Sequence, residues 1–101
     1  MKESALCPRL AKAMEIIGKR WTALIIYRLL DGPQRFNAIE SALPISGRLL
    51  SERLKELEKE NIVERKVYSE VPIRVEYSLT EKGLSLEGAV REIEHWAQKW
   101  I

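Results

Sequence analysis

Residues 65–80 read RKVYSEVPIRVEYSLT and contain two stretches of alternating apolar and polar side chains, separated by a loop around Pro72. Such alternation predicts two antiparallel strands joined as a hairpin. Two strands alone bury too little apolar surface to offset the entropy lost when their backbone is ordered. We therefore expect the hairpin to be attached to a helical body.

The chain before the hairpin has the apolar spacing of helices. Pro8 suits a first helical turn, where its missing N–H is harmless, and two apolar stripes follow on either side of Gly18. The dipeptide Gly32–Pro33 ends the second of these predicted helices. A short third helix is expected within RFNAIESALP, residues 35–44, because its final proline stops it.

A fourth helix is predicted from SGRLLSERLKELEKEN, residues 46–61. Ser46 is the expected N-cap, because a serine oxygen can accept a hydrogen bond from a free N–H of the first turn. Apolar residues recur on one edge at i, i+4 and i+7, namely Leu50, Leu54 and Leu57. The opposite face is polar and carries Arg48, Glu52, Lys55 and Lys59. One side of this helix should therefore pack and the other should be exposed.

Thr80 is the expected N-cap of a last helix over residues 81–100, which has a long apolar stripe. The predicted order is helix, helix, short helix, helix, hairpin and helix, in a single domain over residues 1–101. The predicted fold class is thus mainly α with a small β-hairpin (α+β). Within it we expect a helix-turn-helix at about 36–59 and a wing at about 63–79.

The composition suits one globular domain. The chain has 101 residues, of which 46% are hydrophobic, and this is enough for one core. No apolar run approaches the roughly 20 residues of a membrane span, and the first residues lack the apolar stretch of a signal peptide. We therefore expect a cytoplasmic protein with no membrane partner. The single cysteine, Cys7, excludes an internal disulfide and a cysteine-based zinc site.

Charge is distributed unevenly along the chain. Residues 1–55 contain ten Lys and Arg against five Asp and Glu, whereas residues 56–101 contain seven against ten. The net formal charge is only +2. A basic first half permits a polyanionic partner but does not establish one.

The chemistry of an enzyme is missing from the sequence. The only histidine is His95, the only aspartate is Asp31, and both lie on different predicted elements from Cys7. No nucleophile-base-acid arrangement, glycine-rich phosphate loop or paired-histidine metal spacing can be drawn. We predict no enzymatic activity, no catalytic residue, no metal site and no cofactor.

A DNA-binding arrangement is better supported. A short helix, a tight turn and a second helix with a polar outer face form a helix-turn-helix, whose second helix enters the major groove with its first turns leading. Arg48 is then the candidate for bidentate contact with guanine, Ser51 for a base or phosphate, and Lys55 for a phosphate. Glu52 must accept from a cytosine amine or be neutralised by Arg48, because it would otherwise repel the backbone.

The hairpin strengthens this interpretation, since a basic helix alone often contacts only water. Arg65, Lys66 and Arg74 lie on its strands, so helix and hairpin can contact one duplex. The tip is not basic: it consists of Ser69, Glu70, Val71, Pro72 and Ile73. We therefore expect contact through the flank of the wing, with Arg74 as the strongest candidate. The anchoring face is expected to be Val67, Val75 and Tyr77.

Several segments resemble the HxlR-type transcriptional regulators of bacteria, which are relatives of the MarR-like winged-helix proteins. These segments are CPRLAKAMEIIGKRW, DGPQRFNAIESALPIS, LLSERLKELEKENIVERKVYSEVPIRVEYSLTEKG and the tryptophan-rich end. One departure is that the turn Pro44-Ile45-Ser46 is a residue shorter than the family's usual Pro-Gly-Ile-Ser. With this resemblance, the candidate DNA-binding residues are Arg35, Ser46, Arg48, Ser51, Glu52, Lys55, Lys66 and Arg74.

The resemblance implies a homodimeric winged helix-turn-helix repressor or activator, with its first and last helices forming the dimer interface. The candidate interface residues are Leu10, Met14, Ile93, Trp96 and Trp100. The pattern of the last helix agrees, because its apolar stripe continues through the tryptophans after a small core should be full. The alternative is that both tryptophans fold back onto the core of their own chain.

Cys7 is a candidate redox sensor, because several similar regulators use a cysteine before the first helix to sense oxidants, quinones or aldehydes. A thiol near a helix N-terminus, with Arg9 and Lys2 close in sequence, can react as its thiolate. Any disulfide would have to join two subunits or a small thiol. The alternative is an unreactive, half-buried thiol.

Two hypotheses about function follow. In the first, a homodimer binds a pseudo-palindromic DNA site as a sequence-specific regulator, in the manner of a repressor, and responds to redox or electrophile stress. In the second, the winged helix is a protein-interaction module that uses the glutamate-rich flank of the fourth helix and the tryptophans. The sequence does not identify an operator or a small-molecule effector.

Overall fold

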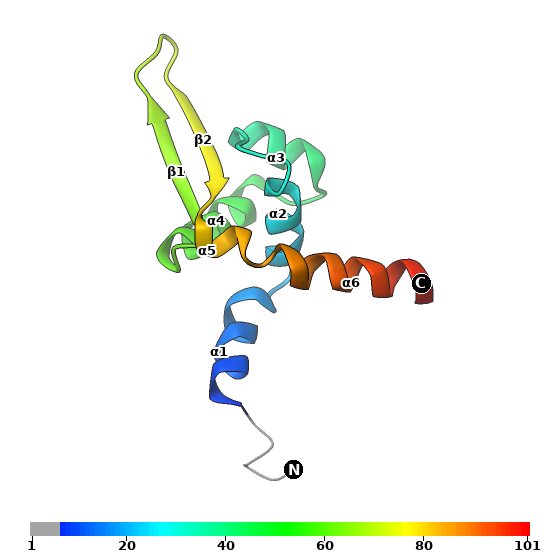
Figure 1. Ribbon diagram of the computed structural model, residues 1–101. Coiled ribbons are helices and arrows are strands. Elements are labelled where there is room, and N and C mark those ends of the chain that lie inside the picture. Colours follow the sequence, from blue (N-terminus) through cyan, green and yellow to red (C-terminus); the bar gives the residue numbers. More distant parts are fainter. Residues whose placement is uncertain (1–6) are drawn as a thin grey trace.

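The computed structural model describes residues 7–101, which form helices and one two-stranded antiparallel hairpin (Figure 1). This arrangement confirms the predicted fold class. In chain order the elements are α1 Pro8–Ile17, α2 Thr22–Leu29, α3 Phe36–Ala42, α4 Gly47–Lys59, β1 Val63–Tyr68, β2 Arg74–Leu79, α5 Glu81–Leu84 and α6 Glu87–Trp100.

The core lies between α2, α3, α4 and the base of the hairpin. Apolar side chains from all four come together because the helical spacing directs one stripe of each helix inward. The side chains of Ile25, Ile26, Ile39 and Leu50 are completely buried. Leu54 and Leu57 continue the same stripe along α4, as the sequence predicted.

The end of α4 sets the direction of the hairpin. Asn61 has a φ of 60°, a left-handed conformation that asparagine tolerates better than most residues. Its N–H donates to the carbonyl of Glu58 at 3.0 Å, and the N–H of Ile62 donates to the carbonyl of Leu57 at 2.9 Å. These two bonds form a Schellman motif, which stops the helix and turns the chain directly into β1.

The chain returns to this turn after β2. The Thr80 N–H donates to the carbonyl of Ile62 at 3.0 Å, and the Thr80 hydroxyl donates to the carbonyl of Asn61 at 2.5 Å. The same hydroxyl oxygen accepts from the Gly83 N–H at 3.1 Å, so Thr80 caps α5 as predicted. Lys82 Nζ donates to the carbonyl of Glu60 at 2.7 Å. The two ends of the hairpin are therefore joined at the C-terminus of α4.

The base of the hairpin gains a third backbone partner from the loop before α3. The Gln34 N–H donates to the carbonyl of Tyr77 at 2.9 Å, and the Tyr77 N–H donates to the carbonyl of Gln34 at 2.8 Å. The side chain of Gln34 in turn bonds Arg28 at the end of α2. Sequence reasoning missed this bridge, because a single paired residue has no periodicity to reveal it.

The prediction that Val67 anchors the hairpin is wrong. Its side chain is 53% exposed, because the helices cover only the half of the hairpin nearest α4 and the other half projects beyond the body (Figure 1). The residues that hold the base are the buried Val63 together with Tyr77 and Leu79, which pack against the core. The hairpin is thus anchored at one end.

The single helix predicted over residues 81–100 is also wrong, because the chain bends between α5 and α6. The Ser85 hydroxyl donates to the carbonyl of Lys82 at 2.5 Å, and the Leu86 N–H donates to the carbonyl of Gly83 at 3.1 Å, three residues back. The bend lets Leu86 and Val90 pack against the core. Tertiary packing therefore overrides the continuous helical pattern.

Helix α6 is attached to α2 through a polar contact. The Tyr27 hydroxyl donates to the carboxylate of Glu94, which raises the pKa of that phenol, and the Arg91 guanidinium lies 5.3 Å from the centre of the Tyr27 ring.

None of the helices among residues 7–101 is long and apolar enough to span a membrane.

Replacement of Gly83 by alanine should destabilise the fold. An added Cβ would lie 2.2 Å from the carbonyl oxygen of Ile62, a backbone atom that cannot move away cheaply. We expect the free energy of unfolding of Gly83→Ala to fall by about 2 kcal/mol, in the range of overpacked sites. Urea denaturation at fixed protein concentration, followed by circular dichroism, measures this change.

Gly88→Ala is the matched control. Nothing lies within 4 Å of a Cβ at that position in α6, so the change should be neutral or stabilising by up to about 1 kcal/mol. Equal unfolding free energies for the two variants would contradict the close approach of Gly83 to Ile62.

Candidate nucleic-acid interface

The helix-turn-helix consists of α3, a four-residue turn and α4. Ser46 occupies the predicted N-cap position, and its Oγ accepts a hydrogen bond from the Leu49 N–H at 3.1 Å. Ile45, the residue before it, is buried in the core and fixes the turn. The shortened turn of this sequence thus still caps α4, and the hydroxyl of Ser46 takes part in this cap.

The exposed face of α4 carries the predicted contact residues. The side chain of Arg48 is 92% exposed and belongs to the first turn of the helix, while Glu52 and Lys55 are exposed one and two turns later. Arg48 Nε lies 3.7 Å from Glu52 Oε1, so the expected neutralisation of Glu52 is geometrically available. Ser51 is half-buried at the edge of this face. This face is therefore polar and carries two cations and one carboxylate, so that it has a small net positive charge.

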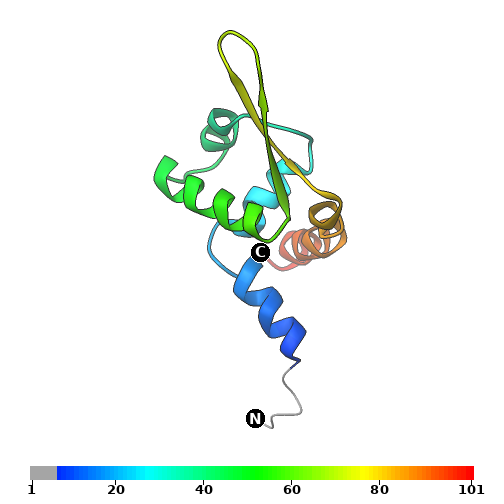
Figure 2. The ribbon, with the colours of Figure 1, turned by 90° about the vertical axis from the view of Figure 1, so that its left-hand side faces the viewer.

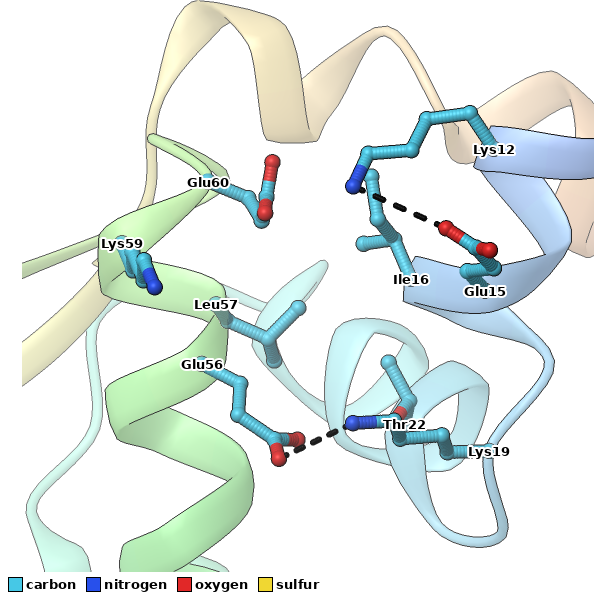
Figure 3. Close-up of a pocket in the computed structure, with 9 residues that line it drawn as sticks. All are labelled: Lys12, Glu15, Ile16, Lys19, Thr22, Glu56, Leu57, Lys59 and Glu60. Atoms are coloured by element: carbon cyan, nitrogen blue, oxygen red, sulfur yellow. Dashed lines mark hydrogen bonds and ion pairs between the residues drawn. The ribbon is translucent and has the colours of Figure 1, made fainter. Parts of the chain in front are cut away.

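The opposite flank of α4 is turned toward the helical body rather than outward. Glu56 Oε2 accepts from Lys19 Nζ at 3.0 Å, and Arg53 bonds both Glu56 Oε1 at 3.3 Å and the carbonyl of Arg20 at 3.2 Å. A hollow of about 360 Å³ lies beside this pair. In Figure 3, Lys12 and Glu15 of α1 lie across from Glu56 of α4 and from Glu60, the C-cap of that helix. Charges there are largely compensated, so this flank is not a polyanion-binding surface.

On the wing, Lys66 is half-exposed and lies beside a carboxylate of its own strand. Its Nζ is 3.2 Å from Glu64 Oε1, and the hydrogen bond to Glu64 raises the pKa of Lys66. An exposed pair of this kind is weak, so the ammonium group can exchange Glu64 for a phosphate at little cost.

Arg74, the strongest wing candidate from the sequence, is engaged within the hairpin. Its guanidinium contacts Glu70 at 2.8 Å and Glu76 at 2.7 Å, and it stacks over the ring of Tyr68 at 4.0 Å. The hydrogen bond to Glu70 raises the pKa of Arg74 above its usual value. These contacts within the hairpin stabilise the wing. They give no support to a role of Arg74 as a free phosphate contact.

Arg65 is the remaining cation on the strands of the wing. It is exposed, and among residues 7–101 no carboxylate lies within ion-pair distance of it. The alternation of side chains along a strand could have predicted this lack of an ion pair. The register pairs Arg65 with Tyr77, so Arg65 lies on the opposite face of the hairpin from Glu64 and Glu76. Arg35, which precedes α3, is likewise exposed and without an ion pair among the residues that the structure describes.

The wing and α3 lie at one end of the molecule and α1 at the other, as two perpendicular views show (Figures 1 and 2). The helix-turn-helix and the wing can therefore approach a duplex without obstruction by α1. In the part of the chain that the structure describes, no three side chains of the metal-binding types are grouped as ligands.

Comparisons with known proteins were made for the whole chain. A family model for the HxlR-like helix-turn-helix matches residues 16–101. The uncharacterized HTH-type transcriptional regulator YvaP of Bacillus subtilis (strain 168) is 57% identical over an alignment 102 residues long, which covers 100% of this chain and 94% of YvaP. The HTH-type transcriptional regulator YodB of the same organism is 47% identical over 98 residues, covering 96% of this chain and 88% of YodB.

Solved structures are similar over almost the same length. The reduced form of YodB matches with a TM-score of 0.84 and 48% identity over 94% of each chain. The oxidized form of the redox regulator HypR matches with a TM-score of 0.87 and 40% identity, covering 92% of this chain and 96% of HypR.

Proposed function

We propose that this chain, which belongs to the HxlR-like helix-turn-helix family, is a homodimeric repressor that binds a pseudo-palindromic operator in a sequence-specific manner. Membership of this family makes the chain a DNA-binding transcriptional regulator and not an enzyme, as the sequence predicted. The single observation that carries the finer proposal is the cationic face at the first turn of α4, where the side chain of Arg48 is 92% exposed.

In the proposed complex α4 lies in the major groove with its N-terminus leading. Arg48 makes the bidentate contact with guanine, a geometry that the planar guanidinium fits. Ser51 and Glu52 lie one turn further along and contact neighbouring base edges, and Lys55 contacts a phosphate. Arg35 and Arg65 contact phosphates of the DNA backbone on either side of α4, and these contacts fix the register of α4 on the duplex.

Homodimerisation is supported by the two terminal helices, neither of which has a buried residue although both are amphipathic. Trp96 is 58% and Trp100 64% exposed, so the alternative that they fold back onto the core is wrong. Ile93 on the same helix and Leu10 and Met14 on α1 are also more than half exposed. Apolar side chains in such number favour burial against a second copy.

An apolar groove of about 300 Å³ between α2 and α6 extends this surface. It is lined mainly by Ala23, Leu24, Val90, Ile93 and Ala97. A second copy that covers the groove and the tryptophans would place two α4 helices on one face of a duplex. The half-sites would then lie about 10 base pairs apart or a multiple of that spacing.

The alternative of a protein-interaction module has less support. It uses the glutamate-rich flank of α4 together with the tryptophans, but Glu56 of that flank is already paired with Lys19 and Arg53. The flank is therefore not a free acidic surface.

Cys7 supports a redox or electrophile response. It is exposed and is the N-cap of α1, where its Sγ accepts from the Leu10 N–H at 3.4 Å. The predicted neighbour Lys2 lies outside the described residues. YodB has been solved in diamide-treated and quinone-bound forms, and HypR in an oxidized form. In the proposed response, the thiolate of Cys7 adds to a ring carbon of a quinone, and protonation of the quinone oxygens gives a hydroquinone thioether. Alternatively, two Cys7 thiols of a dimer give two electrons and two protons to a diazene, which forms one disulfide and reduces the diazene to a hydrazine.

The DNA contacts can be tested with a duplex selected by the wild-type chain from a random 30-base-pair pool. Arg48→Ala should weaken specific binding about 10- to 100-fold, the cost of losing a bidentate base contact, and affect non-specific binding less. Arg65→Ala should weaken both, and should lower the slope of log K against log salt by about one. Fluorescence anisotropy titrations in a salt series measure these effects.

Lys59→Ala is the control, because it removes an exposed cation of the same helix that lines the hollow facing α1. It should leave specific binding nearly unchanged. If Arg48→Ala and Lys59→Ala weaken binding equally, the assignment of the recognition face is wrong.

The dimer interface can be tested by replacing Trp96 and Trp100 together with alanine. Each tryptophan buries a large apolar area at an interface, so the double variant should dissociate at least 100-fold more readily. Circular dichroism should stay that of a folded protein, because neither side chain belongs to the core. Sedimentation measures the association.

Gln98→Ala serves as the control, since residue 98 lies about 200° around the helix from residue 96. A double tryptophan variant that still sediments like the wild type would overturn the proposed interface.

Cys7→Ser tests the sensor. Serine keeps an N-cap oxygen, so α1 and DNA binding should be retained. Treatment with diamide should produce an inter-subunit disulfide and change the DNA affinity of the wild type, and neither should occur in the variant. A quinone should add one adduct mass to the wild type only. Equal DNA affinity and dimer state of the wild type before and after both treatments would remove the proposal.

A further inference from the structure

We infer that the hollow between α1 and α4 binds a small zwitterion, a compound with one ammonium and one carboxylate group on an aliphatic body, such as a free amino acid. The proposed function does not use this hollow, and the inference does not depend on DNA binding. The volume of the hollow, about 360 Å³, lies within the range of small-ligand sites.

The floor of the hollow is apolar apart from one buried hydroxyl group. Thr22 and Leu57 are each only 1% exposed, and the half-buried Ile16 also lines the hollow. The Thr22 Oγ1 is buried and has no hydrogen-bond partner in the part of the chain that the structure describes. A buried hydroxyl without a partner is unfavourable. Thr22 is therefore placed to donate to a polar group that enters the hollow.

Two pairs of opposite charges face each other across this floor. On α1, Lys12 Nζ lies 3.6 Å from Glu15 Oε2, and on the other side Lys19 Nζ lies 3.0 Å from Glu56 Oε2 (Figure 3). Neither pair is buried, and exposed ion pairs contribute little stability. A ligand with both charges can enter such a pair and give each partner a new counterion. A ligand with one charge leaves a carboxylate or an ammonium group without its partner.

The ion pair of Lys19 with Glu56 is the better of the two positions, because it adjoins Thr22. The Thr22 N–H donates to the carbonyl of Lys19 at 3.2 Å, and all three side chains line the hollow. In the inferred complex the ligand carboxylate accepts from Lys19 Nζ and from the Thr22 hydroxyl, and the ligand ammonium donates to Glu56. The aliphatic body packs on Ile16 and Leu57. Because the ligand brings one charge of each sign, the charge balance of the hollow is unchanged.

The hollow stays accessible in the proposed homodimer. Lys12 and Glu15 lie about 100° or more around α1 from the candidate interface residues Leu10 and Met14. A second copy that packs on Leu10 and Met14 therefore leaves the side of α1 that faces the hollow uncovered.

The test titrates three compounds that share one aliphatic arm into the full chain. L-leucine carries an ammonium and a carboxylate group, isocaproate carries the carboxylate alone, and isopentylamine carries the ammonium alone. The titrations are run at about pH 7, where these groups are charged, and at constant ionic strength. Proton–nitrogen correlation NMR follows the backbone amide signals of the residues that line the hollow.

L-leucine should shift these signals to saturation, with a dissociation constant on the order of 1 mM, as expected for a ligand of so few atoms. Isocaproate and isopentylamine should each bind about tenfold more weakly, because each leaves one charge of the ion pair without a partner.

Two variants locate the binding. Glu56→Gln removes the partner of the ammonium group and Thr22→Val removes the hydroxyl, and each should weaken L-leucine binding about tenfold. Thr22→Val should keep or raise the free energy of unfolding, because the hydroxyl that it removes has no partner in the free chain. Glu52→Gln is the matched control: it makes the same change on the exposed face of the same helix, and should bind L-leucine like the wild type.

Three results would overturn the inference: failure of L-leucine to saturate these signals, equal affinities for the three compounds, or wild-type affinity for L-leucine in both Glu56→Gln and Thr22→Val. None of them bears on the proposed function, which the DNA titrations test separately.

Discussion

The backbone carbonyl groups of residues 60–62, in the turn that ends α4, join the two ends of the hairpin. Those of Asn61 and Ile62 accept from Thr80, and that of Glu60 accepts from Lys82, so that both ends of the hairpin meet at one helix end. The last carbonyls of α4 are satisfied by the Schellman motif, whereas the carbonyls of the turn that follows the helix must find their partners elsewhere. Here the segment after β2 supplies the donors, which fixes the base of the wing to the end of α4.

This junction has a direct consequence for recognition. Phosphate contacts of a wing specify a register only if the wing cannot move relative to the helix that contacts the bases. Arg65 lies close to the junction on β1, whereas the tip is far from it and is stiffened by Arg74 against Tyr68. The hairpin is thus fixed at its base by backbone bonds and near its tip by a stacked ion-pair cluster.

Local signals in the sequence predicted most of this architecture, because caps and periodicity are determined within a few residues. Ser46 and Thr80 cap their helices as expected, and the stripe of α4 is buried as expected. Three features depend on residues far apart in the chain and were missed: the bridge of Gln34 to the hairpin, the bend after α5, and the limited cover of the wing. In the candidate site, exposure of Arg48 followed from the helical wheel. The ion pairs of Arg74 with Glu70 and Glu76 did not follow from the sequence, because they depend on how the tip of the hairpin folds.

The distribution of burial separates two tasks within one short chain. The core is assigned to α2, α3, α4 and the hairpin base, which together position the recognition face, while α1 and α6 contribute no buried residue. Under the proposed function these two helices find their cover in a second copy, so that the spacing of the two recognition helices depends on how α1 and α6 pack. Cys7 is the N-cap of α1. Under the same proposal, a covalent change at this sulfur would act on a helix of the dimer interface, and would change DNA binding by altering the spacing of the two recognition helices without any change in the core.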